Sequence, residues 1–402
     1  MNPAKTVVFL SALLIIYSCL VYPLLIAALA ALVRRAPRRL ARYAGSVSVV
    51  LTSYNEAGTV GPKVEDLLGL LDSSGLEGEV IVVSDGSSDH TAAAARAAGG
   101  GRARVIDLRG NVGKAAALSA GCAVATGQAL VLADARQRWA PDALVRLLEN
   151  FAEPSVGAVS GDLLLESAPG VMAGVGFYWK YEKWLRRFEG QVHSTVGVTG
   201  AIAAVRRELF QPIPQGTILD DVYWPLRVVM QGHRVVHDTR ARAYDRLPKK
   251  TADEFHRKVR TLSGNFQLLT LMPELLNPVK NPVWLQFVSH KLCRLVVPWA
   301  MLALLAATAV IHEPWYRVAF CAQIGFYLLG LAGLTRAVGT RLRPASAAAS
   351  ILVLNAAAWC AFWVWVTGRT RKSWRKADYT SVLQDSLGLT GEPRSPWGGS
   401  DR

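Results

Sequence analysis

Four groups of polar and charged residues stand where apolar, strand-like runs end, and their types suit chemistry on a phosphate-bearing ligand. The groups are 52–56, 84–89, 109–114 and 134–137. In parallel sheets ligands bind beyond the carboxyl ends of the strands, so we expect these groups to line one crevice. There Asp85 can accept hydrogen bonds from a base or ribose, and Lys114 can offset diphosphate charge. Asp85 or Ser88 taken alone could instead be a helix cap.

Alternating strand-like and helix-like stretches must position these residues. Strand-like runs at 47–51, 80–83, 104–106 and 129–132 precede helical patterns at 59–71, 88–98, 114–125 and 141–151. Repeated strand–helix units predict an α/β domain, Rossmann-like, with a mainly parallel sheet covered on both faces. Two common nucleotide sites are disfavoured, because no G-x-G-x-x-G follows the first strand and Lys114 lacks the P-loop spacing.

Composition indicates a membrane protein. Of the 402 residues 51% are hydrophobic and 19% charged, against ~25% charged in typical soluble domains. Residues 6–33 carry no charge and exceed the ~20 residues that span a bilayer. Three further uncharged segments follow, at 295–311, 318–335 and 344–368. The five cysteines have no zinc or disulfide spacing.

These segments predict five parts. They are an N-terminal transmembrane helix (1–35), a water-facing domain (46–270), an interfacial amphipathic helix (277–294), about three C-terminal transmembrane helices (295–368) and a basic, flexible tail (369–402). The alternative for 277–294 is an ordinary amphipathic helix packed on the domain.

Arginines directly after the first span predict a multi-pass protein of the plasma (inner) membrane with a cytoplasmic domain. The loop 336–343 and the tail are also basic. Both cannot be cytoplasmic if 344–368 crosses the membrane. That segment could be re-entrant, interfacial or part of a helical hairpin.

The net charge of +15 predicts an anionic partner. Basic clusters flank the predicted spans, where anionic lipid attracts them, and no nucleic-acid motif is visible. We therefore expect contact with membrane lipids and no nucleic acid. A non-catalytic transport or structural membrane protein is a further alternative.

Together the motifs from 46 to about 267 resemble those of family 2 glycosyltransferases, which have the GT-A fold. The chain reads T-S-Y-N-E from Thr52, D-G-S-S-D-H-T from Asp85 and N-V-G-K up to Lys114, and the acceptor-side G-A pair is Gly200 and Ala201. The resemblance implies that the donor nucleotide is bound by Thr52, Tyr54, Glu56, Asp85, Lys114, Asp134 and Arg136.

The resemblance also implies catalytic roles. In L-D-D-V the second acid, Asp221, corresponds to the general base of an inverting transfer, and Asp220 to a neighbour that orients the site or raises its pKa. Two acids at a helix start are the alternative. Arg257 and Arg260 lie where processive relatives carry Q-x-x-R-W, and they would contact acceptor or diphosphate. Thr261 replaces the tryptophan that would stack on the acceptor sugar.

The family's D-x-D metal motif reads Asp134-Ala135-Arg136 here. We expect Asp134 to bind Mg²⁺ or Mn²⁺, the alternative being charge neutralisation by Arg136. The implied enzyme is similar to cellulose, hyaluronan and poly-N-acetylglucosamine synthases. It would transfer sugar from a nucleotide sugar, expected to be a UDP-sugar, to a growing polysaccharide or lipid-linked acceptor in cell-envelope or exopolysaccharide synthesis. A single-sugar transferase to polyprenyl phosphate or a glycolipid is the alternative, and accessory export subunits stay open.

Overall fold

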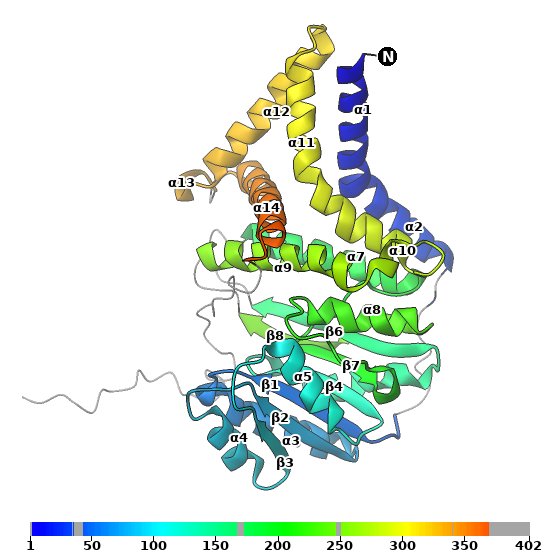
Figure 1. Cartoon of the computed structure of the whole chain (residues 1–402), viewed down its shortest axis with the longest axis vertical. Coiled ribbons are helices and arrows are strands. Elements are labelled where there is room, and N and C mark those ends of the chain that lie inside the picture. Colours follow the sequence, from blue (N-terminus) through cyan, green and yellow to red (C-terminus); the bar gives the residue numbers. More distant parts are fainter. Residues whose placement is uncertain are drawn as a thin grey trace, which may run out of the picture.

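The computed structural model describes residues 2–33, 35, 43–166, 173–246, 251–339 and 341–369. The predictions for the tail beyond 369, and for the arginines between 34 and 42 other than Arg35, lie outside these residues. A sheet domain forms one end of the molecule and a group of long helices the other, with a layer of helices between them (Figure 1).

An eight-stranded mixed sheet organises the described part of the domain. Its strands are β1 Val47–Ser53, β2 Gly78–Ser84, β3 Ala103–Asp107, β4 Ala129–Asp134, β5 Arg138–Trp139, β6 Val156–Glu166, β7 Ile202–Arg206 and β8 Arg234–Arg246. Their order in space is β3-β2-β1-β4-β7-β6-β8-β5. The first four strands are mutually parallel, as the alternation predicted. β7 runs antiparallel to β4 and β6, which makes the sheet mixed.

Helices cover both faces of this sheet. They are α3 Ala57–Ser74, α4 Thr91–Gly99, α5 Lys114–Ala123, α6 Ala143–Leu148, α7 Ala173–Val192, α8 Asp220–Met230 and α9 Thr251–Leu271, with short 3₁₀ turns at η2 Glu149–Ala152, η3 Arg207–Leu209 and η4 Pro273–Leu276. Successive residues of a strand face opposite sides. Val49 and Leu51 of β1 therefore pack in a core with α3 and α6, while Val50 packs in a second core with α5 and α8.

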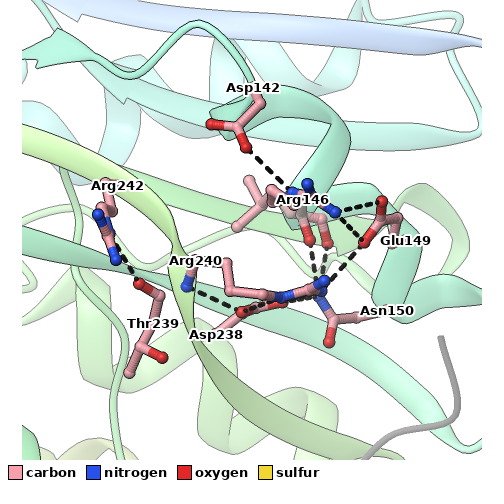
Figure 2. Close-up of polar contacts among 9 residues, drawn as sticks. Asp142, Arg146, Glu149, Asn150, Asp238, Thr239, Arg240 and Arg242 are labelled. Carbon is pink, nitrogen blue, oxygen red and sulfur yellow. Dashed lines mark hydrogen bonds and ion pairs between the residues drawn. The ribbon is translucent and has the colours of Figure 1, made fainter.

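A polar network ties the sharp turn inside β8 to α6 and η2 (Figure 2). Asp238 is buried and accepts hydrogen bonds from Arg240 at 2.9 Å and from the amide of Asn150 at 2.9 Å. Glu149 pairs with Arg240 at 3.0 Å and with Arg146 at 3.2 Å. The buried carboxylate is thus satisfied, and the register of β8 against β6 is secured next to a bulge.

Within the described residues, four helical stretches are long and apolar enough to cross a membrane: Pro3–Val33, Trp284–Ala309, Pro314–Gly333 and Arg343–Val366. They comprise α1 Pro3–Ile16, the π-helix η1 Tyr17–Val21 and α2 Tyr22–Val33; α10 Trp284–Gln286, the π-helix η5 Phe287–Leu292 and α11 Cys293–Ala309; α12 Pro314–Gly333; and α14 Arg343–Val366. A short helix, α13 Arg336–Gly339, precedes α14. All four apolar segments seen in the sequence are helical.

The segment 277–294 differs from the separate interfacial helix expected from its mixed composition. Residues 277–283 form a turn in which the side chain of Asn281 accepts from the backbone N–H of Val283 at 3.0 Å. Helix then runs unbroken from Trp284 into α11. Three of the polar residues that suggested a headgroup location, His290, Lys291 and Arg294, contact Glu182 of α7 instead, and His290 is 1% exposed. They are there because buried carboxylates of α7 need partners.

Candidate active site

Lys114 lies at the centre of the candidate site. Its Nζ is 2.7 Å from Oδ1 of Asp134 and 3.9 Å from Oδ2 of Asp220. A Cβ placed on Gly200 would lie 3.5 Å from that Nζ and 3.6 Å from the Cβ of Asp221. Gly200 therefore lies between the amine and the second acid, within van der Waals distance of both. The structure brings together five residues from four separate parts of the sequence.

Each of these residues stands at the end of an element. Asp134 closes β4, and Asp220 opens α8. Lys114 is the first residue of α5, after Gly113, whose φ of 91° is the left-handed backbone that glycine adopts without strain. Thr52 pairs with Asp134 in the β1–β4 ladder, so it lies beside the metal-motif acid.

Asp85 holds the loop that presents Lys114. Its carboxylate accepts from the backbone N–H of Val112 at 2.8 Å and of Gly113 at 3.0 Å, and its carbonyl accepts from Asn111 at 3.2 Å. The side chain is 3% exposed. The donor contact of Asp85 stays a prediction; in this structure each of its carboxylate oxygens accepts one backbone N–H. These bonds hold the loop that leads to Lys114.

The loops after β1 and β2 are joined to each other. The side chain of Asn55, at a φ of 51°, accepts from the N–H of Ser88 at 2.8 Å. The N–H of Glu56 donates to the hydroxyl of Thr91 at 2.8 Å. Tyr54 lies in the same turn and is partly buried. The predicted donor residues of this loop are therefore hydrogen-bonded to the loop after β2 through their backbone and their neighbour Asn55.

Arg136 has a partner that the sequence did not indicate. Its Nη2 lies 3.7 Å from Oδ2 of Asp245 on β8, and the amide of Gln137 donates to the same oxygen at 2.7 Å. Asp245 is buried. An arginine in the third position of the metal motif is thus balanced by a carboxylate from a distant strand.

The acceptor-side residues fall into two places. Ala201 is buried next to Gly200, and its carbonyl accepts from the indole N–H of Trp139 at 3.1 Å. Arg257 and Arg260 lie on α9. Their spacing puts both on the helix face that also carries Gly264 and Gln267, which contacts the segment before Asp220.

Electrostatics differentiate the two adjacent acids. Burial, followed by the charge of Asp220, raises the pKa of Asp221 to about 6, against the opposing charge of Lys114. Burial lowers the pKa of Lys114, but Asp134 and Asp220 more than reverse this and raise it above its ordinary value. At neutral pH the site therefore holds a firmly charged amine beside a carboxylate poised to take a proton.

The residues present fit a divalent cation held jointly with a diphosphate. No group of three His, Cys, Asp or Glu side chains in the described residues could hold a metal ion by itself. Mg²⁺ characteristically binds one or two carboxylates together with substrate phosphates and waters, so a complete protein cage is not required. Asp134 offers such a carboxylate, one of whose oxygens is engaged by Lys114.

A buried network joins α7 to the apolar helices, and sequence reasoning missed it. His290 of η5 bridges two carboxylates of α7, contacting Glu182 and Glu189 at 2.8 Å each. Tyr22 of α2 donates to Glu189 at 2.6 Å, and Arg294 donates to Glu182 at 2.9 Å. Two acids seven residues apart on an otherwise apolar–aromatic helix face were the available signal.

The network also acts on the candidate base. Burial raises the pKa of Glu182, but its interactions with His290, Arg294 and Lys291 outweigh burial and hold that pKa well below its usual range. Arg186 and Lys291 lie 3.7 and 3.8 Å from Glu182. The same two cations lower the pKa of Asp221 against the larger effect of burial. Charged residues of α7 and η5 thus influence the pKa of Asp221.

With this geometry in hand, comparison with known proteins identifies the domain. Residues 48–213 match the family described as "Glycosyl transferase family 2". The chain therefore carries a glycosyltransferase domain of that family, as its motifs indicated. It has the GT-A fold, with a TM-score of 0.67 to a mannosyltransferase from Pyrobaculum calidifontis solved with GDP-Man and Mn²⁺, at 21% identity over 91% of this chain and 99% of that one.

Curated relatives include poly-beta-1,6-N-acetyl-D-glucosamine synthases. That of Staphylococcus aureus (strain MSSA476) is 23% identical over 236 residues, which cover 56% of this chain and 55% of the relative. That of Staphylococcus epidermidis is 23% identical over 230 residues, with the same coverage. The chain thus spans about half the length of the curated relatives it matches.

Proposed function

We propose that the protein is a membrane-bound, inverting glycosyltransferase that uses a nucleotide sugar. The observation that carries this proposal is the convergence of Lys114, Asp134, Asp220 and Asp221 next to Gly200. An amine, a metal-type carboxylate and a proton-accepting carboxylate are the groups that such a transfer requires.

Asp221 is the general base in this proposal. The acceptor oxygen attacks the anomeric carbon of the donor sugar, and Asp221 takes the acceptor's proton. The bond from that carbon to the diphosphate oxygen breaks, and its electron pair leaves with the nucleoside diphosphate. Lys114 offsets the charge that develops on this leaving group. A raised pKa suits the base, because it strengthens proton affinity while leaving the carboxylate ionised near pH 7.

Asp134 would hold Mg²⁺ or Mn²⁺ against the diphosphate. A bound cation there would add charge neutralisation to that of Lys114. The P. calidifontis mannosyltransferase was solved with Mn²⁺, which supports this assignment by fold. Turnover should fall during titration with EDTA and return with added Mn²⁺. Full activity in chelator would eliminate the metal and leave neutralisation to Lys114 and Arg136.

The identities of the donor and the acceptor are inferred from similarity to known synthases and not from the geometry of the site. We propose a UDP-sugar as donor and a growing polysaccharide or lipid-linked acceptor, in line with the synthases that the chain resembles. Thr261 stands where processive synthases carry tryptophan, which favours a single transfer to polyprenyl phosphate or a glycolipid as the second candidate. Accessory export subunits belong to the polysaccharide case only.

We further propose that the domain is cytoplasmic and that the apolar helices place the protein in the plasma membrane as a multi-pass protein. The arginines that follow α2 in the sequence support this orientation. α14 packs along α9 of the domain through Val259, Ala357 and Ala361. If α14 stays on the domain side, the basic segments before and after it are both cytoplasmic. Protection of a C-terminal tag from reagent added outside intact cells tests this.

The decisive experiment compares wild type with Asp221→Asn in membranes given a panel of radiolabelled nucleotide sugars. We expect the variant to bind nucleotide but to lose turnover. Asp142→Asn, which alters an exposed carboxylate that directly precedes α6 and pairs with Arg146 (Figure 2), is the matched control. Normal turnover by Asp221→Asn would refute the role of the base. Extraction of product into organic solvent, or retention as polymer, separates the two acceptor classes.

A further inference from the structure

Helix α9 has two packed faces. Side chains at intervals of three and four residues share one face of a helix. One face is apolar and carries Phe255, Val259, Leu262 and Phe266. The opposite face carries Gly264, Gln267 and Leu268, of which Leu268 belongs to the domain core. α9 therefore lies between two bodies, and each packs on a different face.

The domain-facing side of α9 grips the segment that leads into the acid pair. The side chain of Gln267 accepts from the N–H of Ile218 at 2.9 Å and donates to the carbonyl of Gly216 at 2.9 Å. A Cβ on Gly264 would lie 2.6 Å from Cγ of Leu219, so only glycine permits this approach. Leu219 directly precedes Asp220, the first residue of α8.

Three of the four positions before the acids, 216, 218 and 219, are thus contacted by one helix. Neither Ile218 nor Gly216 belongs to a helix or strand, so Gln267 supplies pairing that secondary structure does not. The backbone of Asp221 is held on its other side, where its carbonyl accepts from the N–H of Val198 at 2.8 Å. The backbone of the acid pair is therefore held by Gln267 through the preceding segment on one side and by Val198 on the other.

The other face of α9 packs against α14. The ring of Phe266 stacks on Trp365 with centroids 5.5 Å apart and planes 19° apart, and it meets Phe362 at 5.6 Å. Figure 1 shows α14 against α9 at the boundary between the sheet domain and the apolar helices. Phe266 and Gln267 are adjacent in sequence, so a displacement of α9 at the aromatic contact is passed directly to the glutamine.

We propose that Gln267 is a positioning residue for Asp221, and that α14 holds α9 in the place where Gln267 can act. This inference deepens the proposed function and rests on it. Gln267 touches no reacting atom. It fixes the segment 216–219, and the segment fixes where α8 begins. Because a misplacement of about 1 Å can cost ~10²-fold in rate, loss of this support should lower turnover far more than donor affinity.

The test uses the full chain in membranes or detergent. Gln267→Leu removes both hydrogen bonds, and Phe266→Ala loosens the α14 contact while keeping the glutamine. Gln231→Leu is the matched control, because that glutamine also donates to backbone carbonyls, at 3.0 Å to Leu209 and 3.1 Å to Arg227, at the opposite end of α8. We expect kcat to fall 10- to 100-fold for the first two variants, with nucleotide Kd within twofold of wild type and the control close to wild type.

Hydrogen exchange supplies a readout that does not depend on turnover. Amides in 214–222 should exchange faster in Gln267→Leu and in Phe266→Ala than in Gln231→Leu. Unchanged exchange there, or unchanged kcat in Gln267→Leu, would overturn the positioning role. If Gln267→Leu does not fold, Phe266→Ala carries the same expectation from the other face of the helix. Faster exchange in a protein whose wild type turns over no nucleotide sugar would instead count against the proposed function alone.

Discussion

The charge of Asp220 should be visible in the pH dependence of turnover. The base must be ionised to act, so activity falls on the acid side as Asp221 is protonated. Its pKa of about 6, against an ordinary 3.8, reflects burial first and Asp220 second. A rise of this size disfavours ionisation by about 3 kcal/mol. Asp220→Asn removes the second cause and leaves the first.

We therefore expect the acid limb of kcat/KM in Asp220→Asn to move to lower pH. Lys114, 3.9 Å from the acid that is lost, adds to the shift because its charge then acts more fully on Asp221. A shift on the order of one pH unit corresponds to about 1.4 kcal/mol. At pH 5 the rate, relative to its own plateau, should rise from about a tenth to about a half.

The assay follows release of nucleoside diphosphate between pH 4 and 8. Each profile is normalised to its own plateau. A pH-independent loss of rate, caused by the loss of the orienting effect of Asp220, therefore does not change the position of the acid limb. Asp142→Asn should leave the limb where it is in wild type. An acid limb in Asp220→Asn that stays near pH 6, or moves to higher pH, would show that Asp220 does not raise the pKa of the base.

Three other outcomes follow from the described contacts. Lys114→Ala should weaken nucleotide binding 10- to 100-fold, as measured by equilibrium binding. It should also move the acid limb of the pH profile to higher pH, opposite to Asp220→Asn, because Lys114 lowers the pKa of Asp221. An acid limb that moved to lower pH would contradict this role of Lys114. Gly86→Ala should lower the midpoint of thermal unfolding more than Gly100→Ala does. Both glycines have positive φ, but a Cβ on Gly86 would lie 2.2 Å from the backbone of Gly110, whereas a Cβ on Gly100 meets nothing within 4 Å. Equal midpoints for the two variants would contradict this prediction. Glu182→Gln should lower the free energy of unfolding at pH 7 by ~3–5 kcal/mol, as measured by denaturant unfolding. Because the pKa of Glu182 in the folded protein lies well below its ordinary value, the difference in free energy between wild type and variant should shrink as pH falls through that folded pKa. A difference that grew on acidification would refute the ion-pair account.

Much of the domain could be predicted because its signals are local. The alternation of β1 to β4 with α3 to α6 is written in neighbouring residues, and so are the polar loops that end those strands. The four apolar helices are equally local, since each needs only its own length of uncharged residues. The antiparallel β7 and its place beside β4 were not predicted, because pairing between distant strands depends on contacts that no single window contains.

The candidate site divides along the same line. Motif order indicated the candidate residues, including Lys114, Asp134 and Asp221. It did not indicate that both carboxylate oxygens of Asp85 accept hydrogen bonds from backbone N–H groups, or that Arg136 lies close to Asp245. The two interpretations of 277–294 were left open for the same reason, since mixed polar and aromatic residues suit either a membrane surface or contact with buried carboxylates, and only the position of α7 brings those carboxylates to His290.

The sequence by itself determined the sheet strands up to β4, the apolar helices and the types of side chain available for catalysis. Tertiary structure alone decided that an amine from α5, a carboxylate from β4 and two from α8 share one space. It also decided the pKa of the base, the bridge made by His290 and the hold of Gln267 on the loop before α8. The physical reason is that side-chain chemistry belongs to single residues, whereas burial, charge proximity and hydrogen-bond partnership arise only when distant segments pack together.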